Sequence, residues 1–428
     1  MSVWETLTGQ DAVVDTLVTA ASAAALIGGP DGAIAAARAG MTHSWLFTGP
    51  SGAGRVDVAR TFAAALSCER ATAAPAPDEP PGLPGCGECV GCHTVLTDTA
   101  ADLRTVRAEG LSLGVHDVRA LVRDAASAPT SGRYRILLIE EADRLTDSAA
   151  NALLKALEEP ADRSVFLLCA PSVDDVMPTI RSRCRVVALR LPSVDDLVTA
   201  LLRDGVDERA AQVAARAAQG HLGRARLLAV DDQARARRAQ VLALPGRLGR
   251  AAECLAAAAD LVAAANADAD AANSERDEVE AEALRTALGV GATSSGATGR
   301  SKRPTKSAPK AAPKARTMMV RGAAGALKDL EKSQKSRGRR TVLDSLDRAL
   351  LDLAGLYRDV LARQLGATVD PVNPDAAAEI GRLAAAATPE RTLRRLEAVL
   401  ATRDALAANP GLVAQLAVES LALGLRDA

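Results

Sequence analysis

The sequence predicts an α/β fold with a parallel sheet over residues 1–190, followed by domains made of helices. Three short apolar runs carry this prediction: WLF at 45–47, ILLI at 136–139 and VFLL at 165–168. Each run is continuous and rich in aromatic or branched aliphatic side chains, as expected for strands that helices cover on both faces. The segments between the runs show helical spacing of apolar residues, so the strands are joined by helices.

Length and composition narrow the class of protein. A chain of 428 residues predicts about three domains. Its 52 Lys and Arg nearly cancel its 53 Asp and Glu, which gives no support to wholesale coating of nucleic acid. Only seven aromatic rings are present, two Trp, two Tyr and three Phe. Binding of single strands by base stacking requires aromatic platforms, so this composition argues against that function.

The sequence predicts a soluble cytoplasmic protein. The start, MSVWETLTGQ, has neither the basic region nor the apolar stretch of a secretory signal. No run of about 18 strongly apolar residues predicts a membrane span. The seven cysteines are an odd number and three of them are clustered, which favours a metal site in a reducing compartment over a set of disulfides.

A glycine loop follows the first predicted strand and precedes a predicted helix. Its glycines are Gly49, Gly52 and Gly54, and this strand–loop–helix context is typical of a phosphate-binding P-loop. However, Arg55 stands where a working loop has Lys, and Val56 stands where it has the Ser or Thr that binds Mg²⁺. Three hypotheses follow: the loop is scaffolding only, it binds nucleotide without turnover, or it hydrolyses nucleotide.

Two acidic residues, Glu140 and Glu141, follow the second predicted strand. In P-loop ATPases this position supplies an Asp for Mg²⁺ and then a Glu that orients the attacking water. Glu140 can still bind a metal through water, and Glu141 is correctly placed as the base. The alternative interpretation is a strand end that meets solvent.

A cysteine cluster predicts a structural zinc site. Its members are Cys86, Cys89 and Cys92, with Cys68 upstream as the preferred fourth ligand. Zn²⁺ takes four such ligands in a tetrahedron, and Cys-x2-Cys spacing suits a tight knuckle. His93 is the alternative fourth ligand, although its position next to Cys92 strains that arrangement. Four unliganded thiols remain the other interpretation.

The C-terminal half is predicted to be helical with one interruption. Residues 191–245 carry helical spacing, and so does the chain from about 246 onward. The segment of about 266–340 is acidic at first and then basic and rich in Pro and Gly, so we expect it to be disordered. It is either a solvated tether or a weak contact for DNA phosphates. Leucines at 343, 346, 350, 353 and 356 then mark one buried helical stripe.

Taken together, these motifs resemble an AAA+ clamp-loader subunit of bacterial DNA polymerase III. The resemblance rests on WETLTGQ, the glycine loop, the cysteine cluster, EEADRLTDSAANALLKALEEP and the Ser-Arg-Cys at 182–184, and it covers about 1–245. It implies an AAA+ core over 1–190 with a cysteine insert at 68–92. A helical lid over 191–245 and a collar over 246–428 follow.

Within that family the departures resemble the delta-prime type, whose own ATP site is degraded, more than the active gamma/tau type. Besides Arg55 and Val56, Gly223 stands where active members have the second sensor arginine, and Arg224 lies about 100° away around the helix. Ser172 is the best candidate for the first sensor. The resemblance therefore puts ATP and Mg²⁺ in doubt in the chain's own site.

The resemblance also implies a role for Arg183, which in this family reaches the γ-phosphate of ATP held by a neighbouring subunit. It further implies gamma/tau and delta subunits as partners, and the sliding clamp and primed DNA as targets of the complex. No membrane contact is expected. Three alternatives stay open: a plain surface arginine, an active gamma/tau-type ATPase, and a zinc-stabilised scaffold outside any ring.

Overall fold

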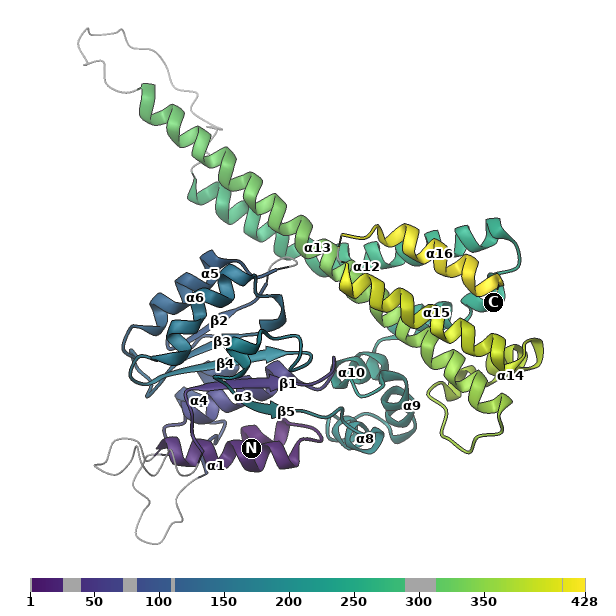
Figure 1. Ribbon diagram of the computed structural model, residues 1–428, viewed down its shortest axis with the longest axis horizontal. Coiled ribbons are helices and arrows are strands. Elements are labelled where there is room, and N and C mark those ends of the chain that lie inside the picture. Colours follow the sequence, from purple (N-terminus) through teal and green to yellow (C-terminus); the bar gives the residue numbers. More distant parts are fainter. Residues whose placement is uncertain are drawn as a thin grey trace, which may run out of the picture. The chain divides into compact units, whose positions relative to one another are not determined.

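The computed structural model describes residues 2–25, 40–71, 83–108, 112–288, 313–409 and 411–427. The chain divides into two compact units, which we describe one at a time (Figure 1). Unit 1 comprises Met1–Ala243 with Ala354–Leu393, and unit 2 comprises Leu244–Leu353 with Arg394–Ala428.

Unit 1 is built on a five-stranded sheet in which every neighbouring pair of strands is parallel, in the order β2-β3-β4-β1-β5. The strands are β1 (Ser44–Thr48), β2 (Leu103–Val106), β3 (Arg135–Ile139), β4 (Ser164–Ala170) and β5 (Arg185–Ala188). The three predicted strands are confirmed as β1, β3 and β4, which are the buried interior of the sheet. The sequence did not predict β2, because an edge strand half exposed to solvent carries polar residues.

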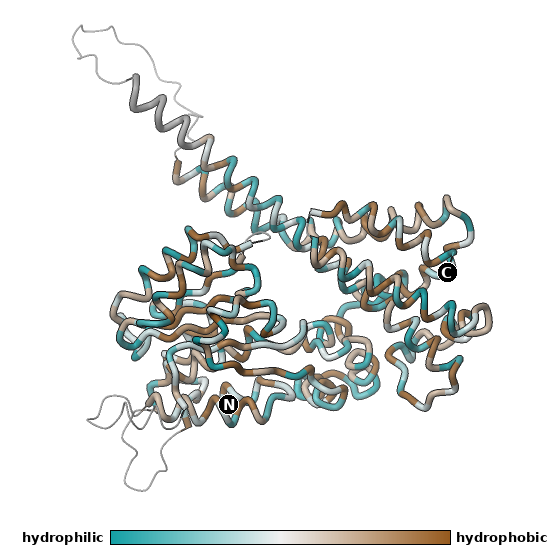
Figure 2. The backbone as a smooth tube through the Cα atoms, in the orientation of Figure 1, coloured by the Kyte–Doolittle hydropathy of each residue, from teal (hydrophilic) through white to brown (hydrophobic). Residues whose placement is uncertain are grey.

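Helices cover both faces of this sheet (Figure 1). One face packs against α1 (Asp11–Ala25), α3 (Arg55–Leu66) and α4 (Val90–Leu96). The other packs against α5 (Val115–Ala125) and α6 (Asp147–Glu158). Short helical turns complete this part of the chain: η1 (Val3–Thr6), η2 (Ala142–Arg144) and α7 (Pro178–Arg181). The predicted α/β core is therefore confirmed, and its strands are among the hydrophobic segments in Figure 2.

Three of the aromatic rings meet beneath α3. The ring of Phe62 lies 4.9 Å from that of Trp45 and 6.4 Å from that of Phe47, both edge to face. All three residues are fully buried. These rings hold α3 against β1, so the residues that follow β1 are positioned by the core.

Four further helices follow the sheet: α8 (Val194–Arg203), α9 (Glu208–Ala218), α10 (Leu222–Val230) and α11 (Asp232–Leu242). They share a small apolar core. Leu242 packs with Leu356 and Ile380. Arg238 donates hydrogen bonds of 2.6 Å to Asp375 and 2.5 Å to Asn373. Residues 354–393, with η4 (Pro374–Ala376) and α14 (Ala377–Ala386), thus belong to unit 1.

The described part of unit 2 consists of helices: η3 (Leu244–Arg247), α12 (Ala251–Ala287), most of α13 (Pro313–Gln364), most of α15 (Pro389–Ala408) and α16 (Ala414–Asp427). The sequence predicted disorder over about 266–340. Both ends of that segment are helical in the structure, the first in α12 and the second in α13. Composition analysis missed these helices because polar contacts join them. Asn273 donates a hydrogen bond of 3.1 Å to Thr341, and Ser345 donates one of 2.9 Å to Asp268. Residues 289–312 lie outside the described residues, so there the expectation stays a prediction.

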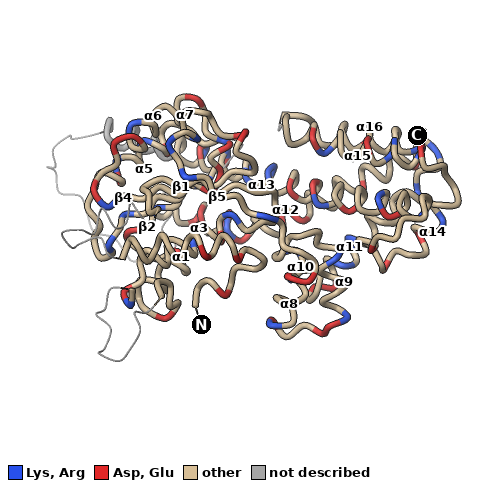
Figure 3. Tube along the Cα trace, turned by 60° about the horizontal axis from the view of Figure 1, so that its bottom comes forward, with Lys and Arg blue, Asp and Glu red and all other residues tan. Residues whose placement is uncertain are grey.

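Charges of both signs are interleaved along the chain (Figure 3). Among the described residues, no helix combines the length and the apolar character that crossing a membrane requires.

Candidate nucleotide and metal sites

The glycine loop lies between β1 and α3, as its sequence predicts. Gly52 has a φ of +94° and Gly54 a φ of +76°, a conformation that glycine adopts without strain. A Cβ on Gly52 would lie 3.0 Å from the Cα and Cβ of His221. The loop therefore requires these glycines both for its turn and for the close approach of α10.

A cavity of about 280 Å³ opens beside the loop. Its walls come from the loop and the start of α3, from the segment 6–10, and from Pro192 with residues 221–223. Gln10 fixes the first segment by donating 2.7 Å to the carbonyl of Arg190. Sequence reasoning assigned no role to Gln10 or His221, because both lie far from the loop along the chain. The WETLTGQ motif was the available signal for the segment that contains Gln10.

Arg55 turns back across the loop. Its guanidinium Nη1 donates a hydrogen bond to the carbonyl of Gly49. A lysine at this position in a working loop reaches toward the phosphates instead. Val56 is partly buried against the core and offers no hydroxyl to a cation. The loop thus retains the fold of a phosphate cradle but lacks two of its chemical groups.

The two acidic residues after β3 have arginine neighbours. A carboxylate oxygen of Glu140 lies 3.5 Å from Arg60 Nη2 and the other lies 3.7 Å from Arg107 Nε. Burial raises the pKa of Glu140, against the opposing effect of both arginines. Glu141 lies 3.5 Å from Arg144 Nε. Both acids therefore form ion pairs within their own chain.

The two sensor positions offer little to a nucleotide. Ser172 Oγ accepts a hydrogen bond of 3.3 Å from the amide of Asp174, which stabilises its own turn. Gly223 has no side chain, and the space where its Cβ would lie is 3.5 Å from the imidazole of His221. Neither position supplies a cation to the cavity.

The cysteine cluster does assemble. The sulfur atoms of Cys68, Cys86, Cys89 and Cys92 all lie within 4.8 Å of one another, and those of Cys68 and Cys89 are 4.0 Å apart. Zn–S bonds of about 2.3 Å in a tetrahedron place sulfur atoms about 3.8 Å apart. The four thiols thus fit a tetrahedral cation. His93 is not a member of this group, whereas Cys68 is.

Hydrogen bonds between the cysteines change their pKa values in opposite directions. A hydrogen bond from Cys92 lowers the pKa of Cys68 to about 3, against the opposing effect of burial. The same interaction raises the pKa of Cys92. The amide of Cys89 also donates 3.4 Å to Cys86 Sγ. A bound cation would take four thiolates and have no open position, so it would supply structural support only.

Arg183 lies just after α7 at the surface of unit 1. Its Nε donates a hydrogen bond of 2.8 Å to Glu158 at the end of α6. Its Nη1 donates another of 2.8 Å to the carbonyl of Thr179. About a third of its side chain is exposed. Sequence reasoning did not foresee Glu158 as its partner, because α6 and α7 are separated by the whole of β4.

The parallel sheet, the glycine loop after an interior strand and the helices that follow define a P-loop α/β protein of the AAA+ class. Two family models match the chain. One is described as the delta subunit of DNA polymerase III and matches residues 34–193, and the other as the C-terminal part of that subunit and matches residues 342–427. Together they cover more than half of the chain. It belongs to the family of DNA polymerase III clamp-loader subunits.

Individual relatives include both types of subunit. The chain is 35% identical to the delta-prime subunit of Pseudomonas aeruginosa over 40% of this chain and 51% of that protein. It is 34% identical to the tau subunit of Escherichia coli over 45% of this chain and 29% of that protein. The match to gamma/tau of Mycobacterium tuberculosis, at 34% identity, covers 35% of this chain and a quarter of the relative's length.

Solved structures show weaker likeness. A gamma-subunit-related protein of Thermotoga maritima matches with a TM-score of 0.36 and 16% identity over 90% of this chain and 94% of that one. A RuvB variant of Thermotoga maritima matches with the same TM-score and 18% identity, over 56% and 66% of the two chains.

Proposed function

We propose that this chain is a delta-prime-type clamp-loader subunit that does not hydrolyse ATP in its own site. The observation that carries the proposal is the hydrogen bond from Arg55 to the carbonyl of Gly49. It ties the guanidinium to the loop backbone, at the position from which a lysine would contact the β- and γ-phosphates.

Three neighbouring features support the same conclusion. Val56 removes the hydroxyl ligand of Mg²⁺. Glu140, which would bind that cation through water, is instead paired with Arg60 and Arg107. Gly223 supplies no sensor arginine. Each change removes positive charge or metal binding from the place where a triphosphate would need it.

The test is turnover by the isolated full chain, in the presence and absence of sliding clamp and primed DNA. We expect no ATP hydrolysis above background under either condition. A DNA-stimulated rate that Glu141→Gln abolishes would contradict the proposal. It would favour the alternative, an active gamma/tau-type ATPase, which the intact loop backbone and the cavity of about 280 Å³ leave room for.

We further propose that Arg183 acts in trans on ATP held by a neighbouring gamma/tau subunit. Its ion pair with Glu158 is partly exposed, with 33% and 48% of the two side chains accessible. Partly exposed pairs of this kind contribute roughly 0.2–1 kcal/mol. Release of the guanidinium toward a neighbour's γ-phosphate is therefore inexpensive, and the phosphate offers a stronger acceptor.

Arg183→Ala tests this role in a loader reconstituted with gamma/tau and delta. We expect ATP turnover at the neighbouring site to fall by about 10³-fold or more, with assembly unchanged, because a trans arginine stabilises charge on the transferring phosphoryl group. Arg181→Ala is the matched control, since Arg181 lies two residues away, is 40% exposed and pairs with Asp174. Equal turnover in the two variants would contradict the trans role.

The cysteine cluster is proposed to hold one structural Zn²⁺, and the chain to work in the cytoplasm within a hetero-oligomer. Its partners would be the gamma/tau and delta subunits, and the complex would act on the sliding clamp and primed DNA. Mass spectrometry of the reconstituted complex tests the partners directly. Failure to assemble with gamma/tau and delta would instead favour a scaffold outside the ring.

A further inference from the structure

One face of α13 changes character along its length, all within unit 2. Toward the C-terminal end, the leucines at 346, 350 and 353 are fully buried. The same spacing of three and four residues continues upstream onto an exposed surface that carries four cations. The basic stripe, as we call it, consists of Lys328, Lys332, Lys335 and Arg339.

The basic stripe points away from α12. Gln334 and Arg337 lie on the opposite side of α13, where they contact Asp277 of α12 at 2.8 and 2.9 Å. Residues of a helix are spaced by 100°, so Arg337 is 180° from Lys328 and the four members of the stripe fall within about 60° of one another. The side of α13 that packs on α12 therefore excludes the stripe.

The three lysines of the stripe have no role in holding the fold. Lys328, Lys332 and Lys335 are exposed and form no ion pair or hydrogen bond with any described residue. Arg339 donates 3.2 Å to the carbonyl of Leu412 and keeps its charge. By contrast, Arg337 is neutralised by Asp277 and Glu280. Asp329 and Glu331 lie beside these lysines on α13, but no ion pair joins them to the stripe among the described residues. The stripe therefore carries four cations against two neighbouring carboxylates, an excess of positive charge.

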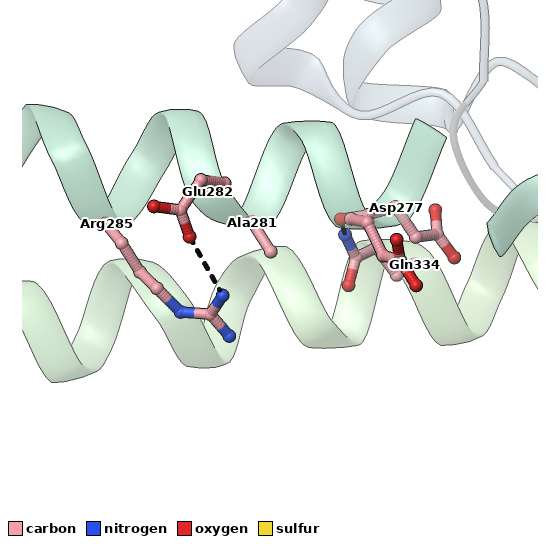
Figure 4. A pocket seen from close by; sticks show the side chains of 6 residues that line it. Asp277, Ala281, Glu282, Arg285 and Gln334 are labelled. Carbon is pink, nitrogen blue, oxygen red and sulfur yellow. Dashed lines mark hydrogen bonds and ion pairs between the residues drawn. The ribbon is translucent and has the colours of Figure 1, made fainter. Parts of the chain in front are cut away.

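A different side of the same helix pair has the opposite charge. There, a hollow of about 520 Å³ is lined by four charged residues of α12, three of them acidic, together with Ala281 and Gln334 (Figure 4). Its single cation, Arg285, lies 3.5 Å from Glu282. An anionic partner would be repelled from this side and attracted to the stripe, so charge complementarity selects one face.

Lysine itself is concentrated in this part of the chain. Seven of the eight lysines fall within residues 302–335, whereas all other cationic residues except Lys155 are arginines. Arginine suits fixed ion pairs, while lysine is a hydrated point charge on a flexible stem. The stripe also lies between the segments that the two family models match, 34–193 and 342–427. It is therefore a feature of this chain beyond the matched regions.

We propose that the basic stripe binds the phosphate backbone of duplex DNA. Eleven residues separate its first and last members, which corresponds to about 16 Å along the helix. One DNA strand presents about five phosphates over that length of duplex axis. Contacts of this kind are independent of sequence and need no aromatic residue, in agreement with the few rings in the chain. This DNA binding is a function in addition to the one proposed for the AAA+ core, and it does not depend on Arg55 or Arg183.

The experiment measures binding of the full chain to a fluorescent 25-base-pair duplex by anisotropy, over a series of salt concentrations. Lys332→Gln/Lys335→Gln is compared with Arg276→Gln/Arg285→Gln on α12. Both variants change the net charge equally within the same helix pair, and glutamine preserves helix propensity. Lysines and arginines elsewhere in 300–321 are present in both, so the difference between the variants reports the stripe.

We expect the lysine variant to bind about tenfold more weakly near physiological salt, and the slope of log K against log salt to decrease by about 1.8, since two phosphate contacts are lost. The arginine variant should bind as the original chain does. Equal weakening in both variants would overturn the proposal, because net charge alone would explain it. So would absence of duplex binding by the original chain. Self-association that only the lysine variant loses, with DNA binding unchanged, would assign the face to a second copy and also overturn it.

Discussion

The two ends of α3 carry the two candidate sites of unit 1, and they differ in what they retain. At its start, the glycine loop keeps its backbone while Arg55 and Val56 replace the groups that bind phosphate and Mg²⁺. Just after its end, Cys68 meets three thiols from the following insert. One buried helix therefore joins a glycine loop that lacks the usual Lys and Ser or Thr to a group of four thiols that could hold a cation. The loop residues Ala53 and Val56 pack in the core of unit 1, so the fold of the loop is stabilised without any bound phosphate.

Among the substitutions that test this difference, loss of the metal site should have the largest effect on the protein. We expect Cys89→Ser/Cys92→Ser to lose about one equivalent of bound zinc and to lower the unfolding temperature by roughly 10 °C or more, because metal binding contributes to folding free energy. Metal analysis and thermal unfolding measure both quantities. Cys184→Ala, outside the cluster, should keep its metal. If the original chain purified without metal and the double variant unfolded at the same temperature, the two ends of α3 would no longer differ in this way.

Restoring the other end of α3 should have an intermediate effect. Arg55→Lys/Val56→Thr returns the lysine and the hydroxyl to a loop whose glycines and cavity are in place. We expect ATP·Mg²⁺ to bind about tenfold more tightly or better than to the original chain, corresponding to about 1.4 kcal/mol. Binding of a fluorescent ATP analogue measures the change, with the exposed Arg104→Lys as control. No gain would mean that other residues of the cavity also prevent binding.

The smallest effect is expected from Glu140→Gln. Burial raises the pKa of Glu140, so its charged form is disfavoured in the folded state and its ion pairs with Arg60 and Arg107 only partly compensate. Glutamine should therefore change the free energy of unfolding at pH 7 by less than about 1 kcal/mol. Because the folded pKa is raised, stability attributable to this carboxyl increases as the pH falls, and the variant should lose that dependence. Chemical denaturation at two pH values checks it; a large loss of nucleotide binding would instead make Glu140 a metal-site residue.

The sequence predicted the parts of this molecule in which local pattern and tertiary role coincide. Interior strands such as β3 and β4 are buried on both faces and read as apolar runs. The Cys-x2-Cys spacing of Cys86, Cys89 and Cys92 indicated a metal site, while the choice of Cys68 over His93 as the fourth ligand stayed open until the structure grouped the four thiols. Glu158 and Arg183 could not be paired in this way, because nothing local to either residue specifies the other. The same applies to Gln10 at the cavity.

The helices of unit 2 show a different failure. Composition predicted disorder for about 266–340, whereas 266–287 and 313–340 are helical. The contacts that align α12 with α13 are polar and join residues about 60 positions apart, such as Arg337 with Asp277. A rule based on mean hydropathy does not count such pairs. Recognising them requires knowing the register of the two helices beforehand.

The cysteine insert is also in contact with the first residues of the chain. Trp4 Nε1 donates a hydrogen bond of 2.7 Å to the carbonyl of Pro84. The amide of Val3 donates one of 2.9 Å to the carbonyl of Gly85, the residue before Cys86. The indole of Trp4 is thus an internal optical reporter of the insert, whereas Trp45 is enclosed in β1. Arrival or departure of a cation should alter the emission of one tryptophan out of two. Exchange of the metal can then be timed in the unlabelled protein.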